Sequence, residues 1–403
     1  ISAAPWNAAH RLVHVGIQGK RMHAEDLPAA NLVFLVDVSG SMDEPAKLPL
    51  VQQSLRMLAE QLRPRDRVAI VVYAGAAGMV LPSTSGADRA AIVSAIDGLR
   101  AGGSTAGGEG IQLAYRVARE NFIRGGNNRV ILATDGDFNV GPSSDGELVR
   151  MIEEKRREGI FLTVLGFGTG NYKDAKMEQL ADHGNGNYAY VDGLTEARKV
   201  LVEEMGGTLL TIAKDVKVQV EFNPARVRAY RLIGYENRAL AAQDFNDDQK
   251  DAGELGAGHS VTALYEIIPA GSTEAIPGVD PLRYQETRTT DAHGEELLTV
   301  KLRYKAPDGE RSELIERPLL DRHTPLAQTS ADFRFAAAVA QWGMLLRESQ
   351  FRGDATYDGV LRLARGSIAR DPNGHRADFV RLVETSRQLA GRARAMDDVA
   401  GRE

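Results

Sequence analysis

The chain has 403 residues, enough for two or three domains, and 43% of them are hydrophobic, which suffices for ordinary buried cores. Its 49 Lys and Arg residues and 55 Asp and Glu residues give a net charge of -6, which argues against a general nucleic-acid or anionic-membrane surface. Because the chain has no cysteine, disulfides, thiolate metal sites and cysteine nucleophiles are excluded.

Membrane attachment has little support in the sequence. No apolar run approaches the ~20 residues of a membrane-spanning helix, so we expect no transmembrane span. No signal peptide is visible either. The chain opens on Ile1 rather than Met, so we expect that it has been trimmed, and a lipid anchor upstream of Ile1 stays open.

Residues 1–29 are too few for a domain. They contain one expected strand, His10–Gln18, in which Leu12, Val13, Val15 and Ile17 supply the apolar positions. This strand has no local partner. We therefore expect it to pair with the β-rich region beyond residue 210, which would make the intervening unit an insertion.

The stretch Leu32–Asp37 is an almost unbroken apolar run closed by a carboxylate, which predicts a strand buried on both faces. Ser39 and Ser41 follow at every second position. In a tight loop this spacing can aim three hard oxygen donors at one point, and hard divalent cations take oxygen ligands. Taken alone, Ser39-Gly40-Ser41 after an aspartate is as readily a plain turn.

Two later loops can complete such a site. Residues 102–111 are glycine-rich, contain Thr105 and open a helix, and the buried strand Asn128–Thr134 leads directly into Asp135. An open parallel sheet places the loops that follow its strands along one edge, where ligands bind. Thr105 and Asp135 can therefore meet the Asp37 loop in space.

Strands and helices alternate throughout this unit, which predicts a doubly wound, mostly parallel sheet. After the first strand, the expected strands are Arg67–Tyr73, Met79–Leu81, Val130–Thr134, Ile160–Phe167 and Tyr188–Val191. The expected helices include Val51–Leu62, Ala87–Leu99, Glu109–Phe122, Asp145–Glu158, Lys173–Asp182 and Leu194–Met205.

The remaining chain changes character twice. Alternating apolar residues predict an antiparallel sandwich with strands at Lys214–Phe222, Val227–Tyr235, Ser260–Pro269, Leu297–Tyr304 and Ser312–Pro318. From Ser330 the apolar spacing becomes helical, which predicts a small helical tail packed on the sandwich. The predicted segments are 1–29 (an N-terminal strand segment), 30–208 (α/β), 209–327 (β-sandwich-like) and 328–403 (helical).

Five oxygen-bearing residues of the three loops occur in a familiar order: Asp37, Ser39, Ser41, Thr105 and Asp135. This set resembles the metal-ion-dependent adhesion site (MIDAS) of the von Willebrand factor type A (vWA) family, over roughly residues 30–205. The resemblance implies that the three hydroxyls bind the metal, while the two carboxylates act largely through water or orient the hydroxyls. It leaves one coordination position for a carboxylate of a partner.

The resemblance implies a non-enzymatic, metal-dependent protein-binding module. Mg²⁺ is the expected ion, with Ca²⁺ or Mn²⁺ as alternatives, and the expected partner is a protein that presents an Asp or Glu. The order of vWA domain, β-region and helical tail is similar to one bacterial branch of envelope-associated proteins. We therefore expect a periplasmic or surface location, with the cytoplasm as the alternative.

Two other functions stay open. A metal-assisted hydrolase or phosphoesterase would need a general base or a second ion, and Glu109 at a helix start is the nearest candidate for such a base. A structural assembly subunit would use the metal only to staple the loops. Substituting Thr105 with Ala separates the structural role from the adhesion role. A protein that uses the metal as a staple would lose stability, whereas an adhesion site would lose binding.

Three weaker signals favour ordinary structural roles. Gly166, Gly168 and Gly170 imitate a dinucleotide fingerprint with the wrong spacing, so we expect them to shape a loop beside the metal site. His183 is expected to be a solvated loop residue. The acidic segment Asp244–Asp251 lacks the glycine and the terminal glutamate of an EF-hand loop, which argues against a calcium site.

Overall fold

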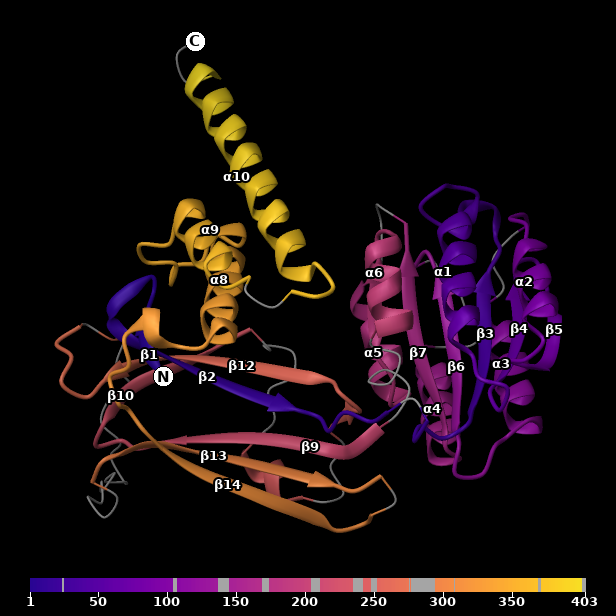
Figure 1. Ribbon diagram of the computed structural model, residues 1–403, viewed down its shortest axis with the longest axis horizontal. Coiled ribbons are helices and arrows are strands. Elements are labelled where there is room, and N and C mark those ends of the chain that lie inside the picture. Colours follow the sequence, from indigo (N-terminus) through magenta and orange to yellow (C-terminus); the bar gives the residue numbers. More distant parts are fainter. Residues whose placement is uncertain are drawn as a thin grey trace.

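The computed structural model describes residues 1–23, 25–103, 107–136, 145–168, 174–203, 211–234, 242–247, 252–274, 276, 294–307, 309–368 and 371–400. Figure 1 shows an α/β unit beside two antiparallel sheets, with a group of helices packed against one of these sheets.

The α/β unit is built on a six-stranded sheet with the order β5-β4-β3-β6-β7-β8. Its strands are β3 (Ala30–Asp37), β4 (Arg67–Tyr73), β5 (Ala77–Ser85), β6 (Asn127–Thr134), β7 (Ile160–Phe167) and β8 (Tyr188–Val191). Neighbouring strands are parallel except β5, which runs antiparallel to β4 at one edge of the sheet. The expected doubly wound, mostly parallel sheet is therefore confirmed.

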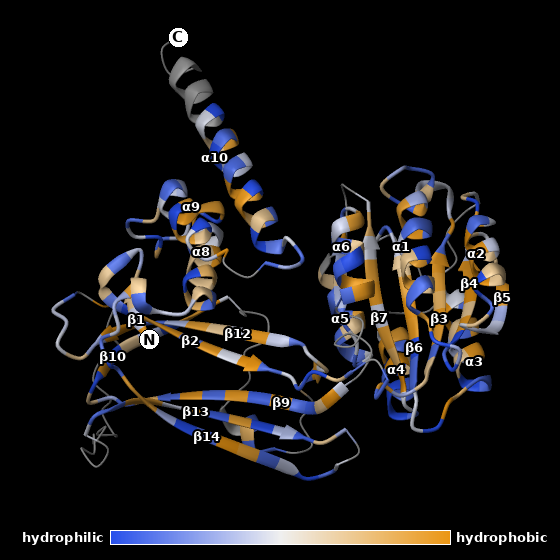
Figure 2. Ribbon diagram, viewed as in Figure 1, coloured by the Kyte–Doolittle hydropathy of each residue, from blue (hydrophilic) through white to orange (hydrophobic). Residues whose placement is uncertain are grey.

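Helices cover both faces of this sheet, which explains why every residue of β3 is buried. One face carries α1 (Leu48–Gln61), α2 (Arg89–Asp97) and α6 (Leu194–Arg198), and the other α3 (Gly107–Glu120), α4 (Asp145–Arg157) and α5 (Asp174–His183). Successive residues of β3 alternate between two cores: Leu32, Phe34 and Val36 face the first group, and Val33 and Leu35 the second. In Figure 2 the strands are accordingly hydrophobic and the outer helix surfaces hydrophilic.

Two four-stranded antiparallel sheets form the second unit. The first, in the order β1-β2-β12-β10, contains β1 (Ser2–Ala4), β2 (Asn7–Gln18), β12 (Ser260–Pro269) and β10 (Val227–Ile233). The second, in the order β11-β9-β13-β14, contains β11 (Gly253–Gly256), β9 (Thr211–Phe222), β13 (Glu296–Lys305) and β14 (Ser312–Leu320). Val13 and Ile267 of the first sheet share a core with Leu297 and Leu298 of the second, so the sheets pack face to face.

The N-terminal strand belongs to this second unit. β2 pairs with β12 along most of its length, from Gln18 opposite Ser260 to Arg11 opposite Ile267. The α/β unit therefore lies, along the chain, between two strands of one sandwich.

The C-terminal helices are α8 (Ala331–Leu346), α9 (Tyr357–Arg365) and α10 (His375–Ala400), and short 3-10 turns occur at Ala242–Asn246 and Leu326–Gln328. Phe333 and Met344 of α8 pack against Trp6 and Leu12, which ties the helices to the first antiparallel sheet. Beyond this contact α10 extends away from the sheets (Figure 1). Among the described residues, none of the helices combines the length and apolar character needed to cross a bilayer.

Several elements differ from the sequence expectation. β1 and β11 were not predicted because three or four residues are too few to show a period of two. β5 is longer than the expected Met79–Leu81. The last helix of the unit is α-helical only as far as Arg198 and continues as a π-helix over Lys199–Glu203, whereas the sequence predicts an α-helix throughout.

Candidate metal centre

The candidate site lies at the edge of the parallel sheet where the strands end. β3 ends at Asp37, its neighbour β6 ends at Thr134, and the register pairs Val36 with Ala133, so Asp37 and Asp135 leave the same edge. After Asp37 the chain turns through a short 3-10 helix, Gly40–Met42.

The loop before α3 is fastened to the Asp37 loop by backbone hydrogen bonds. The Gly40 N–H donates to the Gly103 carbonyl at 3.1 Å, and the Gly102 N–H donates to the Val38 carbonyl at 2.7 Å. Thr105, two residues further along, lies outside the described residues. The backbone therefore brings the segment that leads to Thr105 to the Asp37 loop.

Asp37 is fully buried, with 0% of its surface exposed. One carboxylate oxygen accepts a hydrogen bond from the Ser39 N–H at 2.8 Å, and the other accepts from the hydroxyls of Tyr73 at 3.0 Å and Thr134 at 3.5 Å. Burial raises the pKa of Asp37, the hydrogen bonds from Ser39 and Tyr73 oppose that shift, and the negative charge of Asp135 adds to it.

The charge of Asp37 has no basic counterpart among the residues that the structure describes. No Lys or Arg within the described part of the chain pairs with it. A buried carboxylate without a cation is unfavourable, so a positive ion placed here would stabilise the ionised form.

Two serine hydroxyls lie beside this carboxylate. The Oγ atoms of Ser39 and Ser41 are 3.1 Å apart, with Ser39 buried and Ser41 exposed to solvent. Each hydroxyl oxygen has lone pairs that a hard cation can use.

Asp135 supplies the second carboxylate, and its side chain is only 6% exposed. It follows β6 at a turn in which the Gly136 N–H donates to the Thr134 hydroxyl at 3.2 Å. Unlike Asp37, it has a basic neighbour: the Nζ atom of Lys47 lies 3.2 Å from its Oδ2 atom.

The residues present fit a hard divalent cation. All the donors are oxygens, two of them carboxylates and the rest hydroxyls, which is the chemistry that Mg²⁺ or Ca²⁺ prefers. Within the described ranges there is no group of three or more His, Cys, Asp or Glu side chains arranged for a metal. A site at this edge would therefore depend on its hydroxyls.

The structure thus brings four of the five predicted residues to one edge and leaves Thr105 undescribed. Sequence reasoning missed Tyr73, although it ends β4 directly opposite Asp37 in the register and the rule of shared sheet edges could have found it. It also missed Lys47, which no motif indicates.

The weaker signals have structural explanations. The His183 imidazole hydrogen-bonds to Glu153 at 2.9 Å, between α5 and α4. Lys217 donates to the backbone carbonyls of Asp244 and Asp247, so a lysine already occupies that acidic segment.

Glu109, the candidate base, makes no hydrogen bond or ion pair with the other described residues.

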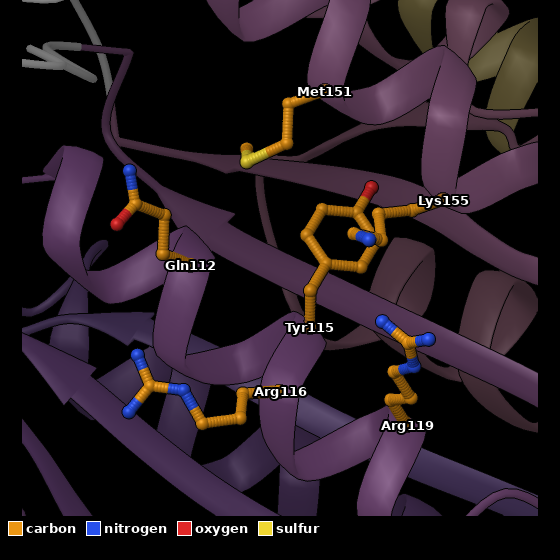
Figure 3. A pocket seen from close by; sticks show the side chains of 6 residues that line it. All are labelled: Gln112, Tyr115, Arg116, Arg119, Met151 and Lys155. Carbon is orange, nitrogen blue, oxygen red and sulfur yellow. The ribbon is translucent and has the colours of Figure 1, made fainter.

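A shallow cavity of about 270 Å³ lies elsewhere in the α/β unit, between α3 and α4 (Figure 3). It is lined by Gln112, Tyr115, Arg116, Arg119, Met151 and Lys155. Lys155 is already paired with Glu154 and Glu158, at 3.3 and 2.9 Å. The lining includes no carboxylate, so this cavity is a poor candidate for a cation site.

Comparison with known families agrees with this geometry. Residues 31–203 match the family model of the von Willebrand factor type A domain. The chain contains a vWA domain. Residues 207–389 match a second model, described as the C-terminal part of the uncharacterized protein YfbK, so the vWA domain is followed by a YfbK-type C-terminal region.

Two relatives of this vWA protein come from bacteria, and one of them is described as uncharacterized. It is 46% identical over 386 residues to the uncharacterized protein YfbK of Escherichia coli (strain K12), covering 95% of this chain and 66% of that relative. It is 30% identical over 155 residues to a UPF0353 protein of Mycolicibacterium paratuberculosis, covering 36% of this chain and 46% of that one. The chain thus spans less than two thirds of the length of these relatives.

One solved structure aligns with most of the chain. It is described as von Willebrand factor type A from Catenulispora acidiphila, and the alignment covers 93% of this chain and 89% of that one, at 17% identity and a TM-score of 0.46.

Proposed function

We propose that this chain is a non-enzymatic, metal-dependent protein-binding module. Its vWA site would hold a divalent cation, with Mg²⁺ expected, and a partner protein would supply an Asp or Glu carboxylate. The residues assigned to the cation are Asp37, Ser39, Ser41, Thr105 and Asp135. Domains of the vWA family typically serve protein interaction, which agrees with the proposal.

The observation that carries the proposal is the environment of Asp37. This carboxylate is fully buried, and burial raises its pKa. The negative charge of Asp135 raises the pKa further, and no Lys or Arg among the described residues pairs with Asp37. A fold maintains such an unfavourable charge when something absent from the chain neutralises it. The adjacent pair of serine hydroxyls points to a hard cation as that missing partner.

The chain's own groups limit the negative charge around the cation. Asp37 and Asp135 contribute at most two formal charges, and the hydroxyls contribute none. Tyr73 and Thr134 hold the Asp37 carboxylate in one orientation, so its position is fixed before any ion arrives. When bound, the cation would supply an electrophilic coordination position that a partner carboxylate can fill.

Isothermal titration of Mg²⁺ into chelator-stripped protein tests the proposal. We expect saturable one-to-one binding by the wild type and its loss in Asp37→Asn. The matched control is Asp66→Asn, which changes an equally buried aspartate elsewhere in the domain and should bind Mg²⁺ as the wild type does, provided that its melting curve shows a folded protein. Absence of binding by the wild type, or equal binding by Asp37→Asn, would contradict the proposal.

A second experiment addresses the partner. An immobilised wild-type chain and an immobilised Asp37→Asn chain are exposed to the same cell extract, in Mg²⁺ and in chelator. The proposal requires proteins that the wild type retains only in Mg²⁺ and the variant never retains. A location in the cell envelope is part of the same proposal and is tested by fractionating cells.

A further inference from the structure

Lys47 reaches back into the candidate metal site from the residue before α1. Its ammonium donates a hydrogen bond to the Ser41 carbonyl at 2.8 Å and lies 3.2 Å from the carboxylates of both Asp135 and Glu44. Only 12% of its side chain is exposed, and the Asp135 side chain is more buried still. This ion pair is therefore shielded from solvent on both sides.

The stem of Lys47 passes close to Gly168, the residue after β7. Gly168 has a φ of +94°, and a Cβ atom on it would come within 2.8 Å of the Lys47 Cε atom and 3.0 Å of its Cγ atom. A glycine at this position therefore leaves room for the lysine. This explains one glycine of the segment that imitates a dinucleotide fingerprint.

Lys47 pairs with one of the two carboxylates of the site. It neutralises Asp135, whereas Asp37 has no basic partner among the described residues. The ammonium of Lys47 lies between the carboxylates of Glu44 and Asp135, so a positive charge sits at the edge of the site.

We infer that Lys47 is a built-in competitor for Asp135 that limits how tightly the site holds its divalent cation. The inference rests on the proposed function, because it concerns the same ion. A cation that enters this edge must share Asp135 with the ammonium and must tolerate a positive charge nearby. Lys47 also makes the loaded site one charge unit more positive than it would otherwise be, which favours an acidic partner.

Three variants of the full chain test this role by Mg²⁺ titration after chelator treatment. Lys47→Met keeps the apolar stem against Gly168 and removes the charge, Lys47→Arg keeps the charge, and Lys155→Met removes a distant paired lysine on α4. We expect Lys47→Met to bind Mg²⁺ on the order of tenfold more tightly than the wild type, from the repulsion of one nearby unit charge. The two other variants should stay within about twofold of it.

Thermal melting separates competition from a purely structural role. In chelator, Lys47→Met should melt below the wild type, because Asp135 has lost its counter-charge. Saturating Mg²⁺ should narrow or reverse this difference. If Lys47 only supported the fold, its replacement by Met would lower the melting temperature equally in chelator and in Mg²⁺. That result would overturn the inference.

The possible titration outcomes distinguish the two proposals. If the wild type and Lys47→Met bind Mg²⁺ equally, or if Lys47→Met binds more weakly, the role of Lys47 is overturned and the proposed function stands. If Lys47→Met binds Mg²⁺ and the wild type does not, Lys47 competes with the cation as inferred, but the proposed function of the wild-type chain is overturned. If neither folded protein binds, both proposals are overturned.

Discussion

Two buried aspartates of the vWA domain make an instructive pair. Asp37 and Asp66 are 0% and 3% exposed, and they lie near opposite ends of the same central strand β3. Asp66 accepts hydrogen bonds from the Ala30 N–H at 2.9 Å and from the Arg63 guanidinium at 2.6 and 2.8 Å. Within the described part of the chain, the groups that donate hydrogen bonds to Asp37 are all neutral.

The pKa values of the two groups diverge accordingly. Burial raises the pKa of Asp66, but its bonds to Arg63 and Ala30 outweigh burial and lower the pKa overall. Burial raises the pKa of Asp37, and there the hydrogen bonds do not overcome it. The same residue type, equally buried, thus stabilises one end of the strand and leaves an unmatched charge at the other.

Arg63 connects Asp66 to the chain segment that enters the domain. Besides binding Asp66, its guanidinium donates to the carbonyls of Leu27 at 2.8 Å and Pro28 at 2.6 Å, in the connection that enters the domain from β2. One arginine therefore fixes a buried carboxylate and an incoming chain segment together. This contrast indicates a structural role for Asp66 and agrees with the proposed role of Asp37 as a metal ligand.

The largest effect that this comparison predicts is on Asp66. Replacing it by Ala leaves Arg63 and the Ala30 N–H without their acceptor, so we expect the free energy of unfolding to fall by about 3 kcal/mol. Urea denaturation of the wild type and Asp66→Ala, both in chelator, measures the loss. A loss below about 1 kcal/mol would show that Asp66 is not the structural anchor inferred here.

The Asp66 contribution also depends on pH. Because the pKa of Asp66 is lower in the folded protein than in the unfolded chain, its contribution is fully present above the unfolded value of 3.8. It is lost as the pH falls through the lowered folded value. The stability difference between the wild type and Asp66→Ala should therefore be constant near neutral pH and shrink in acid.

The next effect concerns the cation. If Mg²⁺ binds only the folded protein, a concentration 100 times its dissociation constant should raise the free energy of unfolding by about 2.7 kcal/mol. We expect this gain in the wild type and in Asp66→Asn and its absence in Asp37→Asn. Melting curves with and without Mg²⁺ provide the measurement, and a gain retained in Asp37→Asn would place the ion elsewhere.

The smallest effect has the opposite sign from ordinary core damage. In chelator, Asp37→Asn removes a buried charge that has no basic partner among the described residues, so this variant should be about 1 kcal/mol more stable than the wild type. Asp66→Asn, in contrast, should be less stable. If both variants lose stability to the same degree in urea denaturation, the contrast between the two aspartates is wrong.

Much of this architecture could be predicted because its signals are local. The apolar run of β3 and the helical spacing around Leu55 predict buried elements directly. Asp37 and Asp135 could be placed together because both follow strands of a parallel sheet. The sequence also indicates that the strand His10–Gln18 needs a distant partner.

What could not be predicted depends on long side chains and special backbone geometry. Lys47 comes ten residues after Asp37, at φ -116° and ψ -111°, in a segment of no regular pattern, so nothing in the sequence shows that its ammonium returns to the site. The fit between its stem and Gly168 joins two segments that are far apart in the chain. The switch to a π-helix after Arg198 likewise follows no residue signal that we can name.

The pairing of β2 with β12 has a consequence for synthesis on the ribosome. β2 ends at Gln18 and its partner β12 begins at Ser260, so β2 can pair with β12 only after the whole vWA domain has been translated. At typical elongation rates of about 5–20 residues per second, this delay is roughly 10–50 s. During this delay, the backbone N–H and C=O groups on the β2 edge that later pairs with β12 are exposed and can pair with other strands. The vWA domain meanwhile has time to fold first.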